Sequence, residues 1–238
     1  DIDGDRILFP YYGKDNHLAF TYRKKTEYDT RKTRATEIFA FITYVLLGWI
    51  IKKKKYQLIF EKFSRTAQDN SYYYFKYCME NLSEAEKKNI YYIMDKSQPD
   101  YNVIKQYDKN IIQFMSFKHM VYALCMKICV STDNISHLYL WHCKPSLVYK
   151  LITSSRKEVF LQHGVTALKK SGEYFAKSKS PSIKCVVATS EIEKDIIVNN
   201  WKYAVKDVPI LGFTRWDVLE DKKDENDKFI LLMPTWRS

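Results

Sequence analysis

Short apolar runs alternate with longer segments of mixed polarity from residue 56 onward. Runs rich in Ile, Val, Tyr and Phe predict buried strands, and they lie at 56–60, 89–94, 111–114, 127–131, 159–162, 185–189 and 208–211. The segments between them predict helices at 68–80, around Pro99, at 117–126, at 145–152 and at 191–203. Strands that alternate with helices of about ten residues indicate right-handed βαβ units and a parallel sheet. The pattern therefore predicts an α/β chain with one Rossmann-like domain at 35–221.

The first 34 residues do not follow this alternation. Two short apolar segments, 7–9 and 19–22, predict a pair of strands joined by a turn near 13–16. We therefore expect a small, β-rich N-terminal appendage at 1–34.

A nearly uninterrupted apolar segment at 38–51 precedes four lysines at 52–55. As a helix it spans about 21 Å, less than the roughly 30 Å of a bilayer's hydrocarbon core. One interpretation is a core helix at the domain surface, with cations at the negative end of its dipole. The other is a helix on a membrane, with Trp49 and the lysines at anionic headgroups. The weak polar face, limited to Thr43, Tyr44 and Gly48, favours the core helix.

Composition narrows the choice of partners. The 238 residues are 46% hydrophobic, which excludes a disordered chain, and the net charge of +11 favours phosphate-bearing substrates or an anionic membrane surface. The lysines are scattered and no nucleic-acid-binding signature is present, so nucleic acid is not expected as a partner. Five cysteines, with no CxxC pair, predict buried free thiols and no metal site.

The two ends indicate an excerpt of a longer protein. The first residue is not Met and no signal-peptide pattern follows it. At the other end, a charged linker (DKKDEND, 221–227) precedes an apolar strand at 229–233. We expect 222–238 to be a linker and the first strand of a second domain that is not completed.

The turn after the strand at 159–162 carries the candidate chemistry. Ligands of α/β sheets usually bind at the carboxyl ends of strands, and Gln162, His163 and Gly164 stand at such an end. Glycine permits a tight turn, and an imidazole exchanges a proton near neutral pH. A core histidine at a strand end is the alternative. Residues 166–170 predict the first turn of a helix.

Other strand ends carry weaker candidates. Asp69 or Asn70 is a good N-cap for the helix at 68–80, and its first amide groups, with Arg65 nearby, suit a phosphate. Ser131 and Thr132 suit either a substrate hydroxyl or the start of a turn. A helix start explains Ser190 as its N-cap and Glu191 as a favourable anion in its first turn. Strand packing is the expected role of His137 and His142.

Four segments follow one another in order: QHGV at 162–165, ATSE at 188–191, LGFTRWD at 211–217 and MPTWR at 233–237. In this order they resemble the CDP-glycerol glycerophosphotransferases, which synthesise teichoic-acid and capsule polymers. The resemblance extends from about residue 56 to the last residue. Many members have Trp-His-Gly-Thr-Pro where this chain has QHGV.

The resemblance implies a two-domain GT-B transferase, of which this chain supplies the N-terminal acceptor domain. It implies transfer of glycerol phosphate, or a similar polyol phosphate, from a CDP-activated donor to an anionic lipid-linked or saccharide acceptor, with release of CMP. It also implies a peripheral place at the cytoplasmic face of the bacterial cell membrane. Since nucleotide contacts come mainly from the second domain, the excerpt alone is expected to be inactive.

The positions of polar residues at strand ends and the family resemblance together indicate roles for individual residues. His163 is the expected general base. Substrate-binding roles are expected for Gln162, Gly164, Lys169, Lys170, Asp69, Asn70 and Glu191, and donor-phosphate roles for Arg215, Thr235 and Arg237. No cofactor or protein metal site is expected, and a Mg²⁺ held by the donor phosphates is compatible with the scheme. Two alternatives stay open: a GT-B enzyme that transfers a sugar from a nucleotide sugar, and a non-catalytic module that docks on a membrane or an acceptor.

Overall fold

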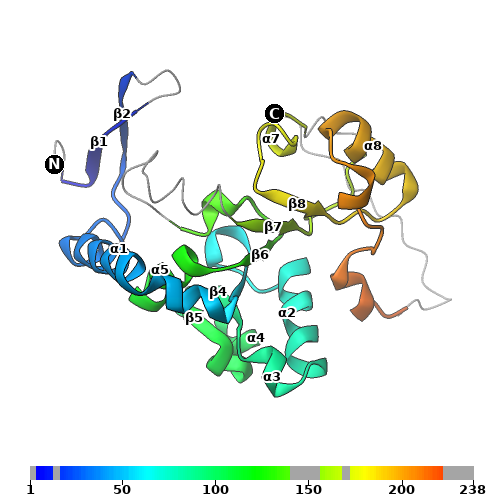
Figure 1. Cartoon of the computed structure of the whole chain (residues 1–238), viewed down its shortest axis with the longest axis horizontal. Helices are drawn as coiled ribbons and strands as arrows, with labels where there is room; N and C mark the ends of the chain where they lie inside the picture. The colour runs from blue at the N-terminus through cyan, green and yellow to red at the C-terminus, as the bar shows by residue number, and fades with distance from the viewer. Residues whose placement is uncertain (1–3, 13–16, 140–155, 168–171, 222–238) are drawn as a thin grey trace, which may run out of the picture.

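A six-stranded parallel sheet forms the centre of the computed structural model, which describes residues 4–12, 17–139, 156–167 and 172–221 (Figure 1). Its strand order is β5-β4-β3-β6-β7-β8. The strands are β3 (Gln57–Phe60), β4 (Ile90–Met94), β5 (Ile111–Gln113), β6 (Ile128–Ser131), β7 (Lys157–Phe160) and β8 (Ile183–Val186). The chain builds outward from β3 first on one side and then on the other, so the topological switch point lies between β3 and β6. The predicted parallel α/β sheet is confirmed.

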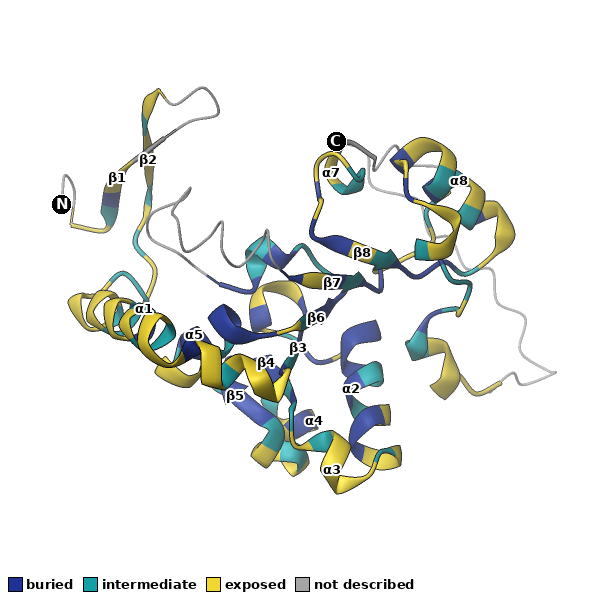
Figure 2. Ribbon diagram, viewed as in Figure 1, coloured by how far each residue is buried: buried dark blue, intermediate teal, exposed yellow. Residues whose placement is uncertain are grey.

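Helices cover both faces of this sheet. The α-helices after β3 are α2 (Asn70–Asn81), α3 (Glu84–Lys87), α4 (Tyr101–Ile104), α5 (Phe117–Cys125), α7 (Gly172–Phe175) and α8 (Glu191–Trp201). Short 3₁₀ turns are η1 (Lys52–Lys54), η2 (Lys62–Ser64), η3 (Lys105–Asn110), η4 (Ile135–His137), η5 (Val205–Asp207) and η6 (Thr214–Val218). Neighbouring strand residues point to opposite faces. Accordingly Ile59 packs in the cluster of α2 and Phe60 in the cluster of α5, and the central strands β3, β4 and β6 are mostly buried (Figure 2).

Most predicted elements are present within about two residues of their expected ends, but the region after β7 differs. β7 ends at Phe160 because Gln162 takes a left-handed backbone conformation (φ +59°) that a strand does not accommodate. The predicted strand at 208–211 is wrong: a single bridge joins Ile210 to Ala188. Residues 166 and 167 are not helical, and the predicted helix at 145–152 lies outside the described residues.

The N-terminal region is a hairpin followed by a long helix. Strands β1 (Arg6–Tyr12) and β2 (Leu18–Lys24) pair antiparallel, which confirms the predicted pairing. Helix α1 (Arg31–Ile51) begins seven residues before the predicted start, because the side chain of Thr30 caps it by accepting a hydrogen bond from the amide of Thr33.

The outer side of α1 is apolar and exposed. Only Ala40 and Gly48 of this helix are buried, and Trp49 is 64% exposed. The preferred interpretation of this segment as a core helix is therefore wrong, although α1 does pack along α5. In the described part of the chain, Arg31–Lys54 is the one helical segment whose length and composition are sufficient to cross a membrane.

Candidate active site at the carboxyl edge of the sheet

Polar side chains gather where the central strands end. Asp69 caps the start of α2, which follows β3, and His163 follows β7. Arg215 arrives from η6, 146 positions along the chain from Asp69. The carboxyl ends of parallel strands meet at one edge, and here that edge includes the switch point between β3 and β6. The structure thus brings together four of the residues predicted for the site, Asp69, Asn70, His163 and Arg215.

Asp69 is the centre of this cluster. Its Oδ2 lies 3.7 Å from Nδ1 of His163, and its Oδ1 accepts hydrogen bonds from the Arg215 guanidinium and from the Asn70 amide. Burial alone would raise the pKa of Asp69, but His163, the Asn70 amide and Arg215 together hold this pKa below its usual value. Asp69 is therefore ionised at neutral pH.

His163 is placed to exchange a proton with a bound molecule. Its side chain is 47% exposed, whereas that of Asp69 is 7% exposed. Because Nδ1 faces the Asp69 carboxylate, Nε2 is the ring nitrogen directed to other partners. A carboxylate that faces Nδ1 orients an imidazole and stabilises its protonated form. A half-exposed imidazole beside a buried carboxylate can take up a proton from a bound molecule and hold it.

Asn70 joins three segments of this edge. Its side-chain Nδ2 donates to the carbonyl of Gln162 at 2.8 Å, and its Oδ1 accepts from the amide of Arg215 at 3.2 Å. Its own carbonyl accepts from Oγ1 of Thr214 at 2.6 Å. The side chain is fully buried. In this structure Asn70 holds the start of α2, the His163 turn and η6 in register.

Gln162, not Gly164, supplies the tight turn before the histidine. Gln162 has a φ of +59°, whereas Gly164 lies outside the left-handed region. The buried Gln162 side chain donates to the carbonyl of Val187 at 2.6 Å and accepts from Oγ1 of Thr166 at 2.8 Å. A Cβ on Gly164 would meet no atom within 4 Å. The predicted reason for the glycine is therefore wrong, and a side chain at this position would enter open space.

Sequence reasoning missed the buried carboxylate of Glu61, immediately after β3. It accepts hydrogen bonds from the backbone amides of Asp69 at 2.9 Å and Tyr72 at 2.8 Å, and also from Gln68. Burial raises the pKa of Glu61 to about 7 despite these bonds. Glu61 fixes the loop that carries Asp69. The only signal in the sequence is a carboxylate placed directly after an apolar strand.

Glu193 is the second missed carboxylate. It is buried and accepts from the amide of Thr166 at 2.6 Å and from the amide and hydroxyl of Thr189, both at 2.7 Å. It therefore fixes the turn after His163 to the end of β8. Its signal was the Ser-x-x-Glu capping pattern that begins at Ser190. The predicted Glu191 instead lies exposed at the first position of α8.

The end of β6 holds a second histidine–carboxylate pair. Nδ1 of His137 lies 2.7 Å from Oδ2 of Asp133, and the ring stacks on Phe63 with centroids 4.0 Å apart. His137 belongs to a 3₁₀ turn, so its predicted place in a strand is wrong. Ser131 donates to the carbonyl of Asp133, and Thr132 is also buried. These residues start a turn, which was one of their two expected roles.

Two further features lie near the carboxyl ends of the strands. Residues 62–64, after β3, all have left-handed φ angles, and such strained backbone is concentrated at functional sites. A pocket of about 260 Å³ opens beside Asn70 and Thr214, over an apolar floor that includes Val159, Leu161 and Val187.

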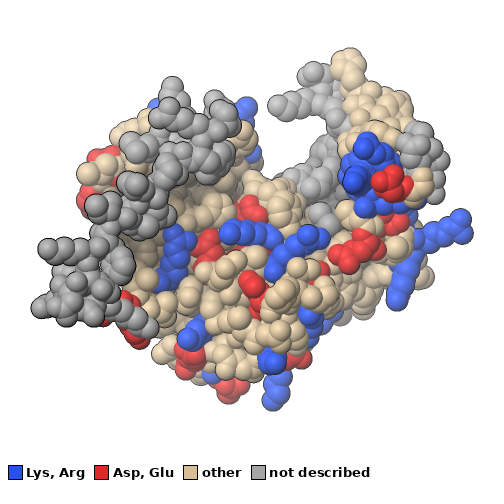
Figure 3. Space-filling model, turned by 180° about the vertical axis from the view of Figure 1, so that it is seen from behind, with Lys and Arg blue, Asp and Glu red and all other residues tan. Residues whose placement is uncertain are grey.

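Basic and acidic side chains lie interspersed over the face seen in Figure 3, so the positive charge forms no single field there.

Some predicted residues lie outside the described part of the chain. They are Lys169, Lys170, Thr235, Arg237 and His142. Within the described ranges, no three His, Cys, Asp or Glu side chains gather in a way that would hold a metal ion.

Most of the chain matches a known protein family. Residues 43–238 match the family described as CDP-Glycerol:Poly(glycerophosphate) glycerophosphotransferase. The chain belongs to this family. The match includes every residue of the Asp69 cluster, and it begins within α1, so the hairpin and the first part of α1 precede it. The resemblance inferred from the four sequence segments is confirmed.

Individual relatives are longer than this chain. It is 34% identical over 175 residues to the minor teichoic acid biosynthesis protein GgaB of Bacillus subtilis (strain 168). The matched region covers 72% of this chain but only 18% of GgaB. Among solved structures, the wall teichoic acid polymerase TagF is similar at 12% identity and a TM-score of 0.46, over 80% of this chain and 49% of TagF. A TagF variant after a CDPG soak gives 10% identity and a TM-score of 0.48, over 83% and 51%. The chain thus spans under a fifth of its curated relative and about half of TagF.

Proposed function

We propose that the complete protein transfers glycerol phosphate, or a similar polyol phosphate, from a CDP-activated donor to an acceptor hydroxyl, releasing CMP. The acceptor would be a lipid-linked or saccharide chain in the synthesis of a teichoic-acid or capsule polymer. Membership of the glycerophosphotransferase family supports the reaction class. The observation that carries the assignment of the base is the half-exposed His163 beside the buried Asp69 carboxylate.

The reaction forms one phosphorus–oxygen bond and breaks another. The acceptor oxygen attacks the β-phosphorus of the donor, and the bond from that phosphorus to the oxygen bridging the two phosphates breaks. CMP leaves with the electron pair, and Nε2 of His163 takes the acceptor's proton. Asp69 stabilises the resulting imidazolium. Positioning and charge stabilisation account for most of the rate in phosphoryl transfer, and a general base adds roughly 10²- to 10⁴-fold.

The neighbouring residues suit supporting roles. A guanidinium has five N–H donors, and Arg215 uses part of this capacity on Asp69, so its other donors suit a donor phosphate. We assign the remaining donor-phosphate contacts to Thr235 and Arg237, and acceptor contacts to Lys169, Lys170 and Glu191. Gln162, Gly164 and Asn70 would shape the acceptor site mainly by holding the His163 turn. With a lipid-linked acceptor, the protein would work peripherally at the cytoplasmic face of the cell membrane.

CMP release by the complete natural chain tests this proposal. With CDP-glycerol and a lipid or oligosaccharide acceptor, we expect His163→Ala to lower the rate by more than about a hundredfold. His17→Ala is the matched control, because His17 is exposed beside β2 and precedes the region matched by the family. Undiminished release in a folded His163→Ala protein would remove His163 as the base. Activity with a nucleotide sugar, and none with CDP-polyols, would replace the proposal with sugar transfer.

A further inference from the structure

Helix α1 carries its apolar side outward. Seven of its exposed apolar residues recur at spacings of three and four, which places them on one face; they are Ile38, Phe39, Ile42, Val45, Leu46, Trp49 and Ile50. Leu47 is also exposed but lies outside this face. The opposite face lies against α5, where Ala40 joins the core with Leu124. A surface helix of a soluble domain has the reverse arrangement, with its apolar stripe toward the core. The outer face of α1 is therefore suited to an apolar environment outside this domain.

The hairpin adds a second apolar face. Leu18, Phe20 and Tyr22 alternate along β2 and so share one side, and Leu8 is the cross-strand partner of Tyr22. All four are exposed, Phe20 at 57%. The hairpin and α1 lie at the same end of the molecule (Figure 1). Exposed apolar surface on this scale marks an interaction site. The hairpin and the first half of α1 precede residue 43, where the family match begins, whereas Val45, Leu46, Trp49 and Ile50 lie within the match.

A basic pocket lies next to the end of α1. Lys53, Lys54, Lys55 and Lys88 border a hollow of about 600 Å³ whose other walls are Tyr56, Asn89, Tyr91 and Tyr122. No described carboxylate forms an ion pair with any of these four lysines. The Nζ of Lys53 stands 5.2 Å from the ring centre of Trp49, so the pocket is continuous with the apolar face of α1.

This pocket is remote from the proposed catalytic cluster. Tyr56 immediately precedes β3 and Asn89 immediately precedes β4, so the pocket borders the amino ends of the strands. Asp69 and His163 lie at the carboxyl ends. A phosphate held by the lysines would therefore not be the phosphate that reacts.

We propose that this surface docks on an anionic lipid bilayer. In this arrangement α1 lies in the boundary between headgroups and acyl chains, and the apolar side of the hairpin lies beside it. The lysine pocket takes the phosphate of a lipid headgroup. The pairing of an apolar helix face with Trp and Lys at its end is typical of interfacial helices, and four unpaired cations complement an anionic headgroup layer.

The packing of α1 argues against a membrane-spanning orientation. Its 21 residues would reach about 31 Å, enough to cross the hydrocarbon core. However, α5 packs along α1, and a helix that crossed the bilayer would take α5 and the adjoining sheet into the hydrocarbon. An orientation parallel to the membrane exposes only the outer face to lipid. The argument rests on the proposed function only in so far as a lipid-linked acceptor requires a membrane.

Vesicle flotation of the complete natural chain tests the docking surface. The probes are phosphatidylcholine vesicles with and without phosphatidylglycerol. We expect Leu46→Glu with Trp49→Glu to abolish flotation with both kinds of vesicle. Lys54→Glu with Lys88→Glu should instead remove the gain that phosphatidylglycerol gives, about fivefold in binding per lysine at low ionic strength.

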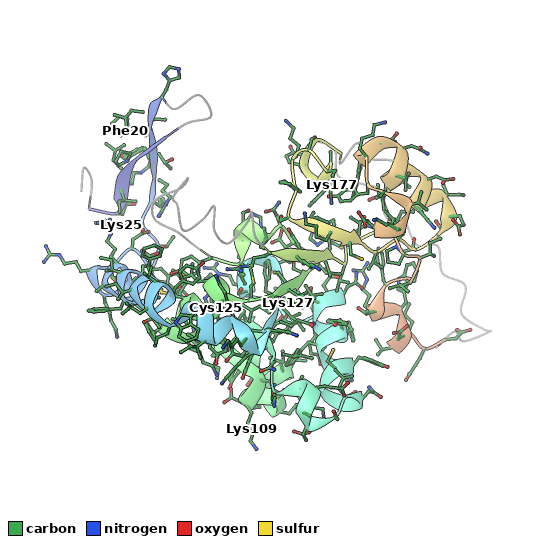
Figure 4. All side chains as sticks on the ribbon, in the orientation of Figure 1. Phe20, Lys25, Lys109, Cys125, Lys127 and Lys177 are labelled. Atoms are coloured by element: carbon green, nitrogen blue, oxygen red, sulfur yellow. The ribbon has the colours of Figure 1, made fainter. Side chains whose placement is uncertain are left out.

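Matched controls separate this surface from general charge and hydropathy. Val205→Glu changes an exposed apolar residue on η5. Lys105→Glu with Lys109→Glu removes two exposed lysines from η3, and Lys109 lies at the opposite end of the molecule from the hairpin (Figure 4). Both controls should float like the wild type, which would support the assigned surface.

Three outcomes would overturn the proposal. They are wild-type protein that stays with the unbound fraction, flotation that survives the Leu46 and Trp49 changes, and a wild-type dimer that those changes dissociate. The last result would assign the surface to a second copy of the chain. CMP release with a soluble acceptor, measured on the same variants, distinguishes the docking proposal from the proposed function. A variant that has lost only membrane docking should still release CMP. If the wild type releases no CMP but still floats, only the proposed function fails.

Discussion

The carboxyl edge of the sheet and the outer face of α1 depart from the usual distribution of residues in opposite directions. At the sheet edge, two glutamates and an asparagine are buried, where charged groups seldom are. Along α1, aromatic and aliphatic side chains are exposed. The buried polar groups are satisfied by named hydrogen bonds that fix Asp69 and the His163 turn. The outer apolar residues of α1 belong to no core cluster of the described structure, and this difference separates a preorganised site from a docking surface.

The largest expected effect is on the Asp69–His163 pair. Asp69→Asn should lower CMP release by about 10³- to 10⁴-fold, because the amide neither stabilises an imidazolium nor holds the ring in the same tautomer. The rate of CMP release by the complete chain measures this.

The second histidine–carboxylate pair supplies a matched control for that measurement. Asp133→Asn alters the same chemistry at the end of β6, where it stabilises a turn beside His137. CMP release should stay within a few-fold of the wild type. Equal losses in the two variants would show that the Asp69 effect reflects general disturbance of the sheet edge and not a role beside the base.

A smaller effect concerns Glu61 and pH. The folded carboxyl, with its pKa raised by burial to about 7, keeps its proton in a range where the unfolded chain, with a pKa of 4.5, has released it. The folded state therefore binds more protons between these values, and the free energy of unfolding falls as the pH rises from 4.5 to 7. Each group of this kind contributes up to about 1.4 kcal/mol per pH unit.

The test compares slopes and not absolute stabilities. Glu158 shows a similar raised pKa, and His119, whose pKa burial lowers to about 3, contributes a slope of opposite sign. Glu61→Gln should remove one carboxyl's share of the slope, measured by urea unfolding of the complete chain across this pH range. Glu86→Gln, on an exposed helix start, should leave the slope unchanged. Parallel curves for the wild type and Glu61→Gln would contradict the assignment.

These features differ in how far the sequence could predict them. Strands buried on both faces need nearly continuous apolar runs, so β3, β4, β5 and β6 were found close to their actual ends. Asp69 and His163 meet because the carboxyl ends of parallel strands share an edge, but the sequence alone did not pair these two residues. The end of β7 was misplaced because Gln162 takes a left-handed conformation in which its side chain bonds the carbonyl of Val187, 25 positions along the chain, and a local pattern does not show such a contact.

The sequence alone does not predict which single polar residues are buried or which face of a helix packs on the protein. Glu61 begins a polar loop and Glu193 lies in the first turn of α8, positions at which a glutamate is usually exposed, and only the tertiary arrangement encloses them. The pattern at 38–51 identified an apolar helix but could not say which face the protein covers. That face is set by α5, which packs along α1 on the side that carries Ala40.

The smallest expected effect is also the most direct test of the difference between the protein core and the exposed outer face of α1. In the absence of lipid, Trp49→Glu should change the free energy of unfolding by no more than about 0.5 kcal/mol, as for other exposed sites. Phe75→Ala, on the buried side of α2, should cost about 3–5 kcal/mol. Hydrogen exchange of the β3 amides within the complete chain reports both changes. A cost for Trp49→Glu near that for Phe75→Ala would mean that protein covers the outer face of α1, and the lipid-docking proposal would then fail.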